Sequence, residues 1–130
     1  MNHQAKKTIL LIEDDADQIM MYQNKFELSG FAFISADTAQ EGLDRAKKEK
    51  LDIILLDLLL KELTVPTGFE ILKKLKKQEE TKNIPVIILT NYGTRQARDK
   101  GLKLGAKEFI IKSQVTPSKL VEKIKEILNK

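Results

Sequence analysis

The stretch DIILLDLLL, residues 52–60, is an almost unbroken apolar run that contains one carboxylate in its middle, Asp57. Continuous apolar runs of this length are typical of parallel strands that are buried on both faces. An ionised carboxylate is costly to bury unless a partner compensates its charge. The stretch therefore predicts a buried strand that ends at Asp57, with a cation close to the carboxylate.

Four more apolar runs surround this one and alternate with amphipathic segments. They are TILLIE at 8–13, FAFISA at 31–36, PVIILT at 85–90 and EFIIK at 108–112. The segments between them repeat apolar residues at helical spacing, and the last one opens with Thr116 as a cap and Pro117 at its first helical position. Five alternations of strand and helix predict an α/β fold of the (βα)5 type: a doubly wound, five-stranded parallel sheet with helices on both faces.

Length and composition limit the class of protein. The chain has 130 residues, of which 42% are hydrophobic and 32% charged, and it has no cysteine. We expect a single domain over residues 1–130, with residues 1–6 forming a frayed N-terminus. The absence of a membrane-length apolar run, of a signal peptide and of cysteines favours a cytoplasmic protein with no membrane contact. The initial methionine and the ending after the fifth helix favour a complete natural chain.

The net charge of +4 raises the question of a nucleic-acid partner. However, the lysines fall in RAKKEK, KKLKK and EKIKEILNK, where apolar residues separate them at helical spacing. Solvated helix faces explain this pattern better than a nucleic-acid surface. Five phenylalanines and two tyrosines also offer few platforms for base stacking, so we expect no nucleic-acid partner.

Chemically active side chains stand where four of the five predicted strands end. The first strand ends in Glu13, Asp14 and Asp15, the third in Asp57, the fourth in Thr90 and the fifth in Lys112. In open α/β sheets, ligands bind outside the carboxyl ends of the strands. If the first and third strands are neighbours, their acids converge, and a divalent cation would relieve the repulsion. Oxygen ligands without Cys or a well-placed His favour Mg²⁺ or Mn²⁺ over zinc.

Each of these residues also has a simpler explanation when taken alone. Asp14, Asp15 and Asp57 could cap the helices that follow them, which is a common role for Asp. Thr90 could be an ordinary strand-end residue and Lys112 a surface lysine with a partly covered stem. Four such coincidences at one edge of a sheet are harder to accept than one site, so we favour the site.

With these motifs in place, the chain resembles the receiver domain of bacterial two-component response regulators. The resemblance extends over almost the whole length, through ILLIEDD, IILLDLLL, GFEILKKLK, IPVIILTNYG and LGAKEFIIKS. It implies a flavodoxin-like strand order of 2-1-3-4-5. It also implies a stand-alone receiver, a phosphorylation-dependent switch that catalyses at most its own phosphorylation and dephosphorylation and is otherwise not an enzyme.

The resemblance assigns a role to each residue of the predicted site. Asp57 would accept a phosphoryl group from a histidine kinase or a histidine phosphotransfer protein. Glu13, Asp14, Asp57 and the backbone carbonyl of Leu59 would hold Mg²⁺ (or Mn²⁺). Lys112 and Thr90 would contact the phosphoryl group, and Thr90 and Phe109 would switch the face formed by the fourth helix, fifth strand and fifth helix. That face would bind an unidentified downstream protein, and whether the chain also dimerises on phosphorylation stays open.

The sequence departs from the usual receiver pattern beside the site. Gly68 follows Asp57 by eleven positions rather than eight, so the loop over residues 58–67 is about three residues longer. We favour a tolerated insertion over a lid or a new partner contact. Asn91 replaces a small residue after Thr90 and could narrow access for the phosphoryl group. An apolar residue and an aromatic one, Leu59 and Tyr92, flank the site and predict slow self-hydrolysis.

Two other functions compete with the receiver hypothesis. A Mg²⁺-dependent phosphatase with an aspartyl nucleophile usually has a second Asp two positions later, where this chain has Leu59. A degenerate receiver fold could serve as a scaffold or nucleic-acid module through its positive charge. The complete set of Asp14, Asp57, Thr90 and Lys112 makes degeneracy the weaker hypothesis.

Overall fold

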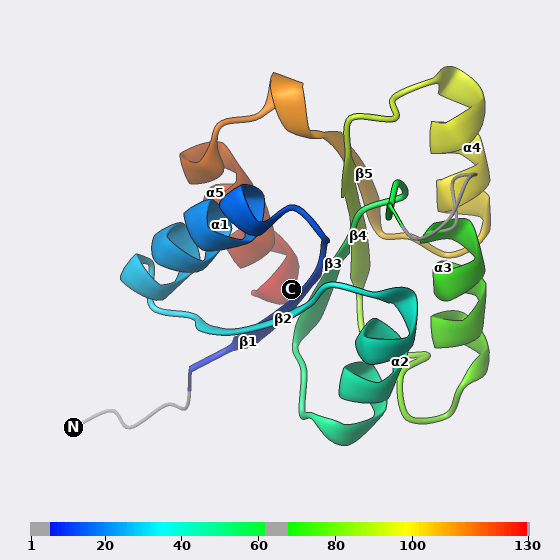
Figure 1. Ribbon diagram of the computed structural model, residues 1–130, viewed down its shortest axis with the longest axis horizontal. Coiled ribbons are helices and arrows are strands. Elements are labelled where there is room, and N and C mark those ends of the chain that lie inside the picture. Colours follow the sequence, from blue (N-terminus) through cyan, green and yellow to red (C-terminus); the bar gives the residue numbers. More distant parts are fainter. Residues whose placement is uncertain (1–5, 62–67, 130) are drawn as a thin grey trace.

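Five parallel strands form one sheet with helices on both of its faces (Figure 1). The computed structural model describes residues 6–61 and 68–129. The strands are β1 (Thr8–Ile12), β2 (Ala32–Ala36), β3 (Ile53–Leu56), β4 (Val86–Thr90) and β5 (Glu108–Ile111). The helices are α1 (Ala16–Leu28), α2 (Ala39–Lys48), α3 (Gly68–Lys77), α4 (Arg95–Lys103) and α5 (Pro117–Leu128), and a short 3-10 helix, η1, covers Lys112–Gln114.

The strand order is β2-β1-β3-β4-β5, and all four pairings are parallel. This confirms the predicted (βα)5 fold and the predicted order 2-1-3-4-5. Four strands begin and end within one residue of the apolar runs that predicted them, and β3 ends one residue before Asp57, where its strand was predicted to end. The order reverses between β1 and β3, which is the place where open α/β sheets bind their ligands.

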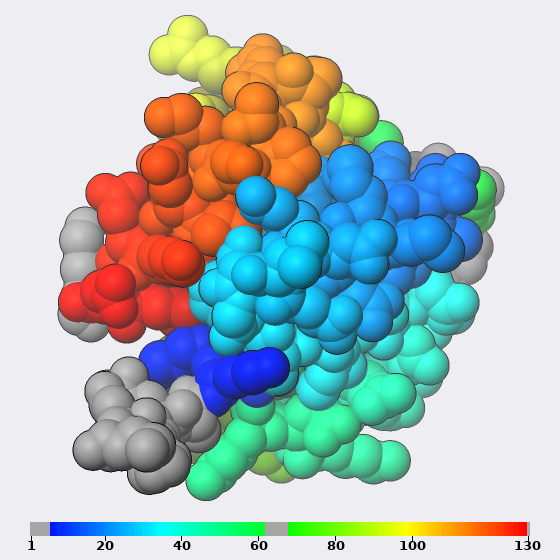
Figure 2. Space-filling view, turned by 90° about the vertical axis from the view of Figure 1, so that its left-hand side faces the viewer, coloured from blue at the N-terminus to red at the C-terminus, as the bar shows by residue number. Residues whose placement is uncertain are grey.

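The two faces of the sheet are covered by different helices. Helices α1 and α5 lie on one face, where Figure 2 shows them side by side, and α2, α3 and α4 lie on the other (Figure 1). Successive strand residues point to opposite faces, so Ile9 and Leu11 join the core under α1 and α5, while Leu10 and Ile12 join the core under the other three helices. Both faces of β1, β3 and β4 are therefore buried, which explains why their sequences are apolar throughout.

Side-chain caps begin four of the helices, including the one predicted at Thr116. Asp15, Thr38, Thr94 and Thr116 each accept a hydrogen bond from the backbone N–H three residues later. Helix α1 ends before Gly30, whose φ of +94° is a left-handed conformation that glycine adopts without strain. Helix α4 buries just Ala97 and Gly101 of its nine residues, in line with its apolar-poor sequence.

Two expectations fall partly outside the described residues. Residues 1–5 of the expected frayed terminus and residues 62–67 of the lengthened loop belong to neither described range. Within those ranges, no helix has both the length and the apolar character that are needed to cross a membrane.

Candidate functional site

The predicted site residues meet at the carboxyl ends of β1, β3, β4 and β5. Ile12 pairs with Leu56 in the sheet register, and the Asp57 N–H donates to the Ile12 carbonyl oxygen at 3.1 Å. Glu13 and Asp57 are each the first residue after their strand, so the sheet itself places them next to each other. On the other side, the last residue of β4, Thr90, pairs with the residue before Lys112.

A buried ion-pair network lies at the centre of this edge. The Lys112 ammonium lies 2.7 Å from Asp57 Oδ2 and also donates to Glu13 Oε1. The side chains of Lys112, Glu13 and Asp57 are 8%, 2% and 7% exposed. Lys112 is therefore not a surface lysine: it is the cation that compensates two buried carboxylates.

The second carboxylate oxygen of Asp57 has its own donors. Asp57 Oδ1 accepts hydrogen bonds from the Thr90 hydroxyl at 2.7 Å and from the Leu59 backbone N–H at 3.0 Å. Thr90 is fully buried, and its own hydroxyl oxygen accepts from the Tyr92 N–H at 3.2 Å. Thr90 is thus a specific partner of Asp57 and not an ordinary strand-end residue.

The acidic run after β1 divides into three different roles. Asp15 is the N-cap of α1 and accepts from the Gln18 N–H at 3.1 Å, so the helix-cap explanation holds for this residue. Glu13 Oε2 accepts from the backbone N–H groups of Asp14 and Asp15. The Asp14 carboxylate instead accepts from the backbone N–H of Lys61, in the loop that follows β3. The carboxylates of Glu13 and Asp14 therefore bond to Lys112 and to the loop after β3, while Asp15 caps the helix.

The electrostatics of the network favour a charged lysine. Burial works to lower the pKa of Lys112, but its hydrogen bonds to Asp57 and Glu13, and the charges of these acids, outweigh burial and raise it. Burial raises the pKa of Glu13, and the charge of Asp57 adds to this effect, while the hydrogen bond from Lys112 opposes it. Burial therefore destabilises the ionised form of Glu13, and the hydrogen bond from Lys112 offsets part of this effect.

Beside this network is a cavity of about 200 Å³, and its lining includes Glu13, Asp14, Asp57, Leu59, Asn91 and Lys112. Three carboxylates and a backbone carbonyl are hard oxygen donors of the kind that Mg²⁺ and Mn²⁺ prefer, so the predicted ligand set fits such an ion in its chemistry. Within residues 6–61 and 68–129, however, no three acidic, His or Cys side chains are arranged to share one ion. The hydrogen bonds of the acids give the reason: Glu13 is held by Lys112 and Asp14 by the Lys61 N–H.

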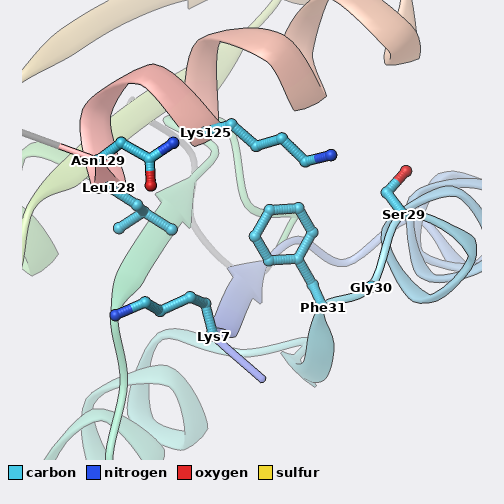
Figure 3. Close-up of a pocket in the computed structure, with 7 residues that line it drawn as sticks. All are labelled: Lys7, Ser29, Gly30, Phe31, Lys125, Leu128 and Asn129. Carbon is cyan, nitrogen blue, oxygen red and sulfur yellow. The ribbon is translucent and has the colours of Figure 1, made fainter. Parts of the chain in front are cut away.

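A second cavity, of about 230 Å³, lies at the end of the sheet where β1 and β2 begin (Figure 3). Its lining residues are Lys7, Ser29, Gly30, Phe31, Lys125, Leu128 and Asn129, and Lys125 reaches from α5 toward Phe31. None of these residues carries a carboxylate, and Lys125 lies in the last turn of α5, whose partial negative charge it offsets. The acidic chemistry is therefore a property of the first cavity.

The remaining predicted residues take different positions around the site. Phe109 is buried, at 9% exposed, in the core beneath α4, where a Cβ added to Gly101 would lie 3.4 Å from its ring. Leu59 is 44% exposed and lines the cavity. Tyr92 adjoins the site through its backbone N–H, while its side chain packs against the core.

The sequence did not predict two hydrogen bonds beside the site, and it did not explain why residue 68 is glycine. It did not predict the bond from the Lys61 N–H to Asp14, nor the bond from the Ser113 N–H to Asn91 Oδ1 at 3.0 Å. It noted Gly68 by its spacing alone. A Cβ at Gly68 would lie 2.7 Å from the Asp57 carbonyl oxygen, so the start of α3 can approach the site here because this residue is glycine.

Comparisons with known proteins agree with this geometry. The family model of the response regulator receiver domain matches residues 9–125. The chain is 33% identical over 124 residues to the phosphate regulon transcriptional regulatory protein PhoB of Pseudomonas aeruginosa; the match takes in 95% of this chain but 52% of PhoB, so the chain spans about half of that relative. It is 30% identical to the polar-differentiation response regulator DivK of Brucella ovis, over 94% of this chain and 96% of DivK.

A solved structure supports the same assignment. The crystal structure of a CheY-like receiver domain protein from Methanospirillum hungatei superposes with a TM-score of 0.86 at 31% identity, covering 96% of this chain and 95% of that one. The fold, its strand order and the relatives thus all indicate a response regulator receiver domain.

Proposed function

This chain belongs to the response regulator receiver family of two-component signalling, and on that premise we propose that Asp57 accepts a phosphoryl group from a phosphohistidine. The donor is a histidine kinase or a histidine phosphotransfer protein. One observation carries the proposal: a buried carboxylate is held between an ammonium and a hydroxyl at the wall of a cavity.

The transfer uses groups that are already in contact. A carboxylate oxygen of Asp57 attacks the phosphorus atom, a P–O bond forms, the P–N bond to the donor imidazole breaks, and the imidazole leaves. Charge then accumulates on the phosphoryl oxygens next to Lys112, whose ammonium is 2.7 Å from Asp57 Oδ2. Hydrogen bonds to charged groups contribute about 1.5–3 kcal/mol each, so Lys112 stabilises the product and the transition state before it.

The family implies a divalent ion, which would neutralise negative charge on the phosphoryl oxygens. We propose that Glu13, Asp14, Asp57 and the Leu59 carbonyl hold Mg²⁺ or Mn²⁺. For this, Glu13 must turn from Lys112, and Asp14 from the Lys61 N–H. Lys112 keeps its second hydrogen bond to Asp57 and so remains beside the acceptor.

The same residues connect phosphorylation to the surface. The Thr90 hydroxyl donates to Asp57 Oδ1, and we propose that it donates to a phosphoryl oxygen once Asp57 is modified. Phe109 lies in the core against α4 and would repack with that shift. The ion pair of Lys123 with Glu108, at 3.2 Å, ties α5 to β5. A change at Thr90 would thus alter the α4-β5-α5 face, which would bind a downstream protein or a second copy of the chain.

We therefore propose a phosphoacceptor switch that works in the cytoplasm, where a phosphohistidine partner can reach it, rather than an enzyme that turns over an external substrate. The experiment is to incubate the protein with Mg²⁺ and acetyl phosphate and to measure intact mass. We expect one added phosphoryl group in the wild type and none in Asp57→Asn. Multiple turnover of a phosphomonoester would support the phosphatase alternative, and no modification at all would support a degenerate scaffold.

A further inference from the structure

We propose that Asn91 is a phosphoryl-binding residue of this site, with its side-chain amide nitrogen donating a hydrogen bond to the phosphoryl group on Asp57. This inference rests on the proposed function and assigns a new contact within it. Asn91 occupies the position after Thr90, where the sequence suggested an obstacle to the phosphoryl group.

The orientation of the Asn91 amide follows from its partner. The Ser113 backbone N–H lies 3.0 Å from Asn91 Oδ1. A backbone N–H can only donate, so the atom that faces it has to be the amide oxygen, and the NH₂ group forms the other end of the side chain. Nδ2 has no hydrogen-bond partner among the residues that the structure describes. Two donor hydrogens are therefore available at that end.

The position of Asn91 brings its side chain to the wall of the cavity beside Asp57. Asn91 follows Thr90, whose hydroxyl lies 2.7 Å from Asp57 Oδ1, and its partner Ser113 follows Lys112, whose ammonium lies 2.7 Å from Asp57 Oδ2. The side-chain bond thus joins the residues that directly follow the two side chains in contact with Asp57. Asn91 also lines the same cavity as Asp57 and Lys112.

The chemistry of the ligand matches this arrangement. A phosphoryl group on Asp57 brings three non-bridging oxygens and about two negative charges. The Lys112 ammonium and the Thr90 hydroxyl can satisfy part of that acceptor capacity. A neutral amide donor adds a charge-assisted hydrogen bond to the phosphoryl group. Because the Ser113 N–H holds the amide oxygen, the amide is oriented before the phosphoryl group arrives. Asn91 is exposed to solvent before phosphorylation, so its donors lose bonds to water when they engage the ligand.

Beryllium fluoride with Mg²⁺ is the probe, because it imitates a phosphoryl group on a carboxylate without a chemical step. Its dissociation constant is measured by ¹⁹F NMR for wild type, Asn91→Ala and Asn91→Asp. Asn83→Ala is the matched control, since Asn83 is an exposed asparagine in the α3–β4 connection, at the other edge of the sheet. We expect about tenfold weaker binding for Asn91→Ala, at least as large a loss for Asn91→Asp, and no change for the control.

A second measurement distinguishes a hydrogen bond from Asn91 to the ligand from a purely structural role of the Asn91–Ser113 hydrogen bond. The side-chain amide signals of Asn91, identified by their loss in Asn91→Ala, should shift downfield and exchange more slowly when the fluoride complex binds. Wild-type affinity in Asn91→Ala, or weaker binding with unmoved wild-type amide signals, would overturn this inference alone. If the wild type binds beryllium fluoride no more tightly than Asp57→Asn does, the proposed function is overturned, and this inference with it.

Discussion

Replacing Lys112 by methionine removes the only charge that compensates Glu13 and Asp57 within the described part of the chain, and the effect on stability can be worked from the contacts. Met keeps most of the volume and the apolar stem of the side chain but leaves both carboxylates without their ammonium. Removing one partner of a buried ion pair typically costs about 3–5 kcal/mol.

The remaining donors bring the expected cost to the low end of that range. Glu13 Oε2 still accepts two backbone N–H groups, and Asp57 Oδ1 keeps the Thr90 hydroxyl and the Leu59 N–H. We therefore expect Lys112→Met to lower the free energy of unfolding by about 3 kcal/mol. A domain of this size has about 5–15 kcal/mol in total, so the loss is a large fraction.

The assay is urea denaturation in EDTA, with wild type, Lys112→Met and a matched lysine variant. Lys123→Met is that control, because Lys123 pairs with Glu108 at 3.2 Å but the two side chains are 45% and 34% exposed. Exposed pairs contribute less than about 1 kcal/mol. With a urea m-value of about 2 kcal/mol/M, Lys112→Met should lower the midpoint by about 1.5 M and the control by less than about 0.5 M.

The double variant Glu13→Gln with Lys112→Met tests the cause. It should recover part of the loss, because one of the two uncompensated charges is gone. The reasoning would be refuted if Lys112→Met cost no more than the Lys123 control. It would also fail if Glu13→Gln made the Lys112 variant still less stable.

Three further predictions follow from single contacts. Gly68→Ala places a Cβ 2.7 Å from both the Asp57 carbonyl oxygen and the Leu58 Cα, so it should cost about 2 kcal/mol in urea denaturation and slow phosphorylation; unchanged stability would show that α3 shifts freely. Leu59→Asn should shorten the half-life of phosphorylated protein by about tenfold, because a polar side chain at the cavity admits water; an unchanged half-life in a time course of intact mass would rule out shielding. Burial lowers the pKa of Lys76, so the folded state holds this proton less tightly than the unfolded state, and stability should rise with pH in the window below 10.5; the rise, seen in urea midpoints across that window, should vanish in Lys76→Met.

The fold was predictable because its decisive signals are local. An apolar run such as residues 52–60 marks a strand that is buried on both faces, and residues such as Thr116 and Pro117 mark where a helix begins. Asp37 and Thr38 both precede the first turn of α2, and both residue types can cap a helix. The structure selects Thr38.

The sequence predicted that the side chains of the site converge, but it did not predict their individual hydrogen bonds. Parallel strands bring their carboxyl ends to one edge, so the meeting of Glu13, Asp57 and Lys112 follows from the strand order. The contacts of Asp14 with the Lys61 N–H and of Asn91 with the Ser113 N–H depend on backbone groups in loops. Every residue except proline offers the same N–H, so residue types carry no signal for such bonds.

Reductive trapping tests the central claim most directly. Protein treated with acetyl phosphate and Mg²⁺ is reduced with borohydride, which converts an aspartyl phosphate to homoserine, and the peptides are sequenced by tandem mass spectrometry. The account predicts homoserine at position 57 and at no other aspartate, dependent on both the donor and the ion. Homoserine at another position, or phosphate on a hydroxyl side chain with Asp57 intact, would contradict it.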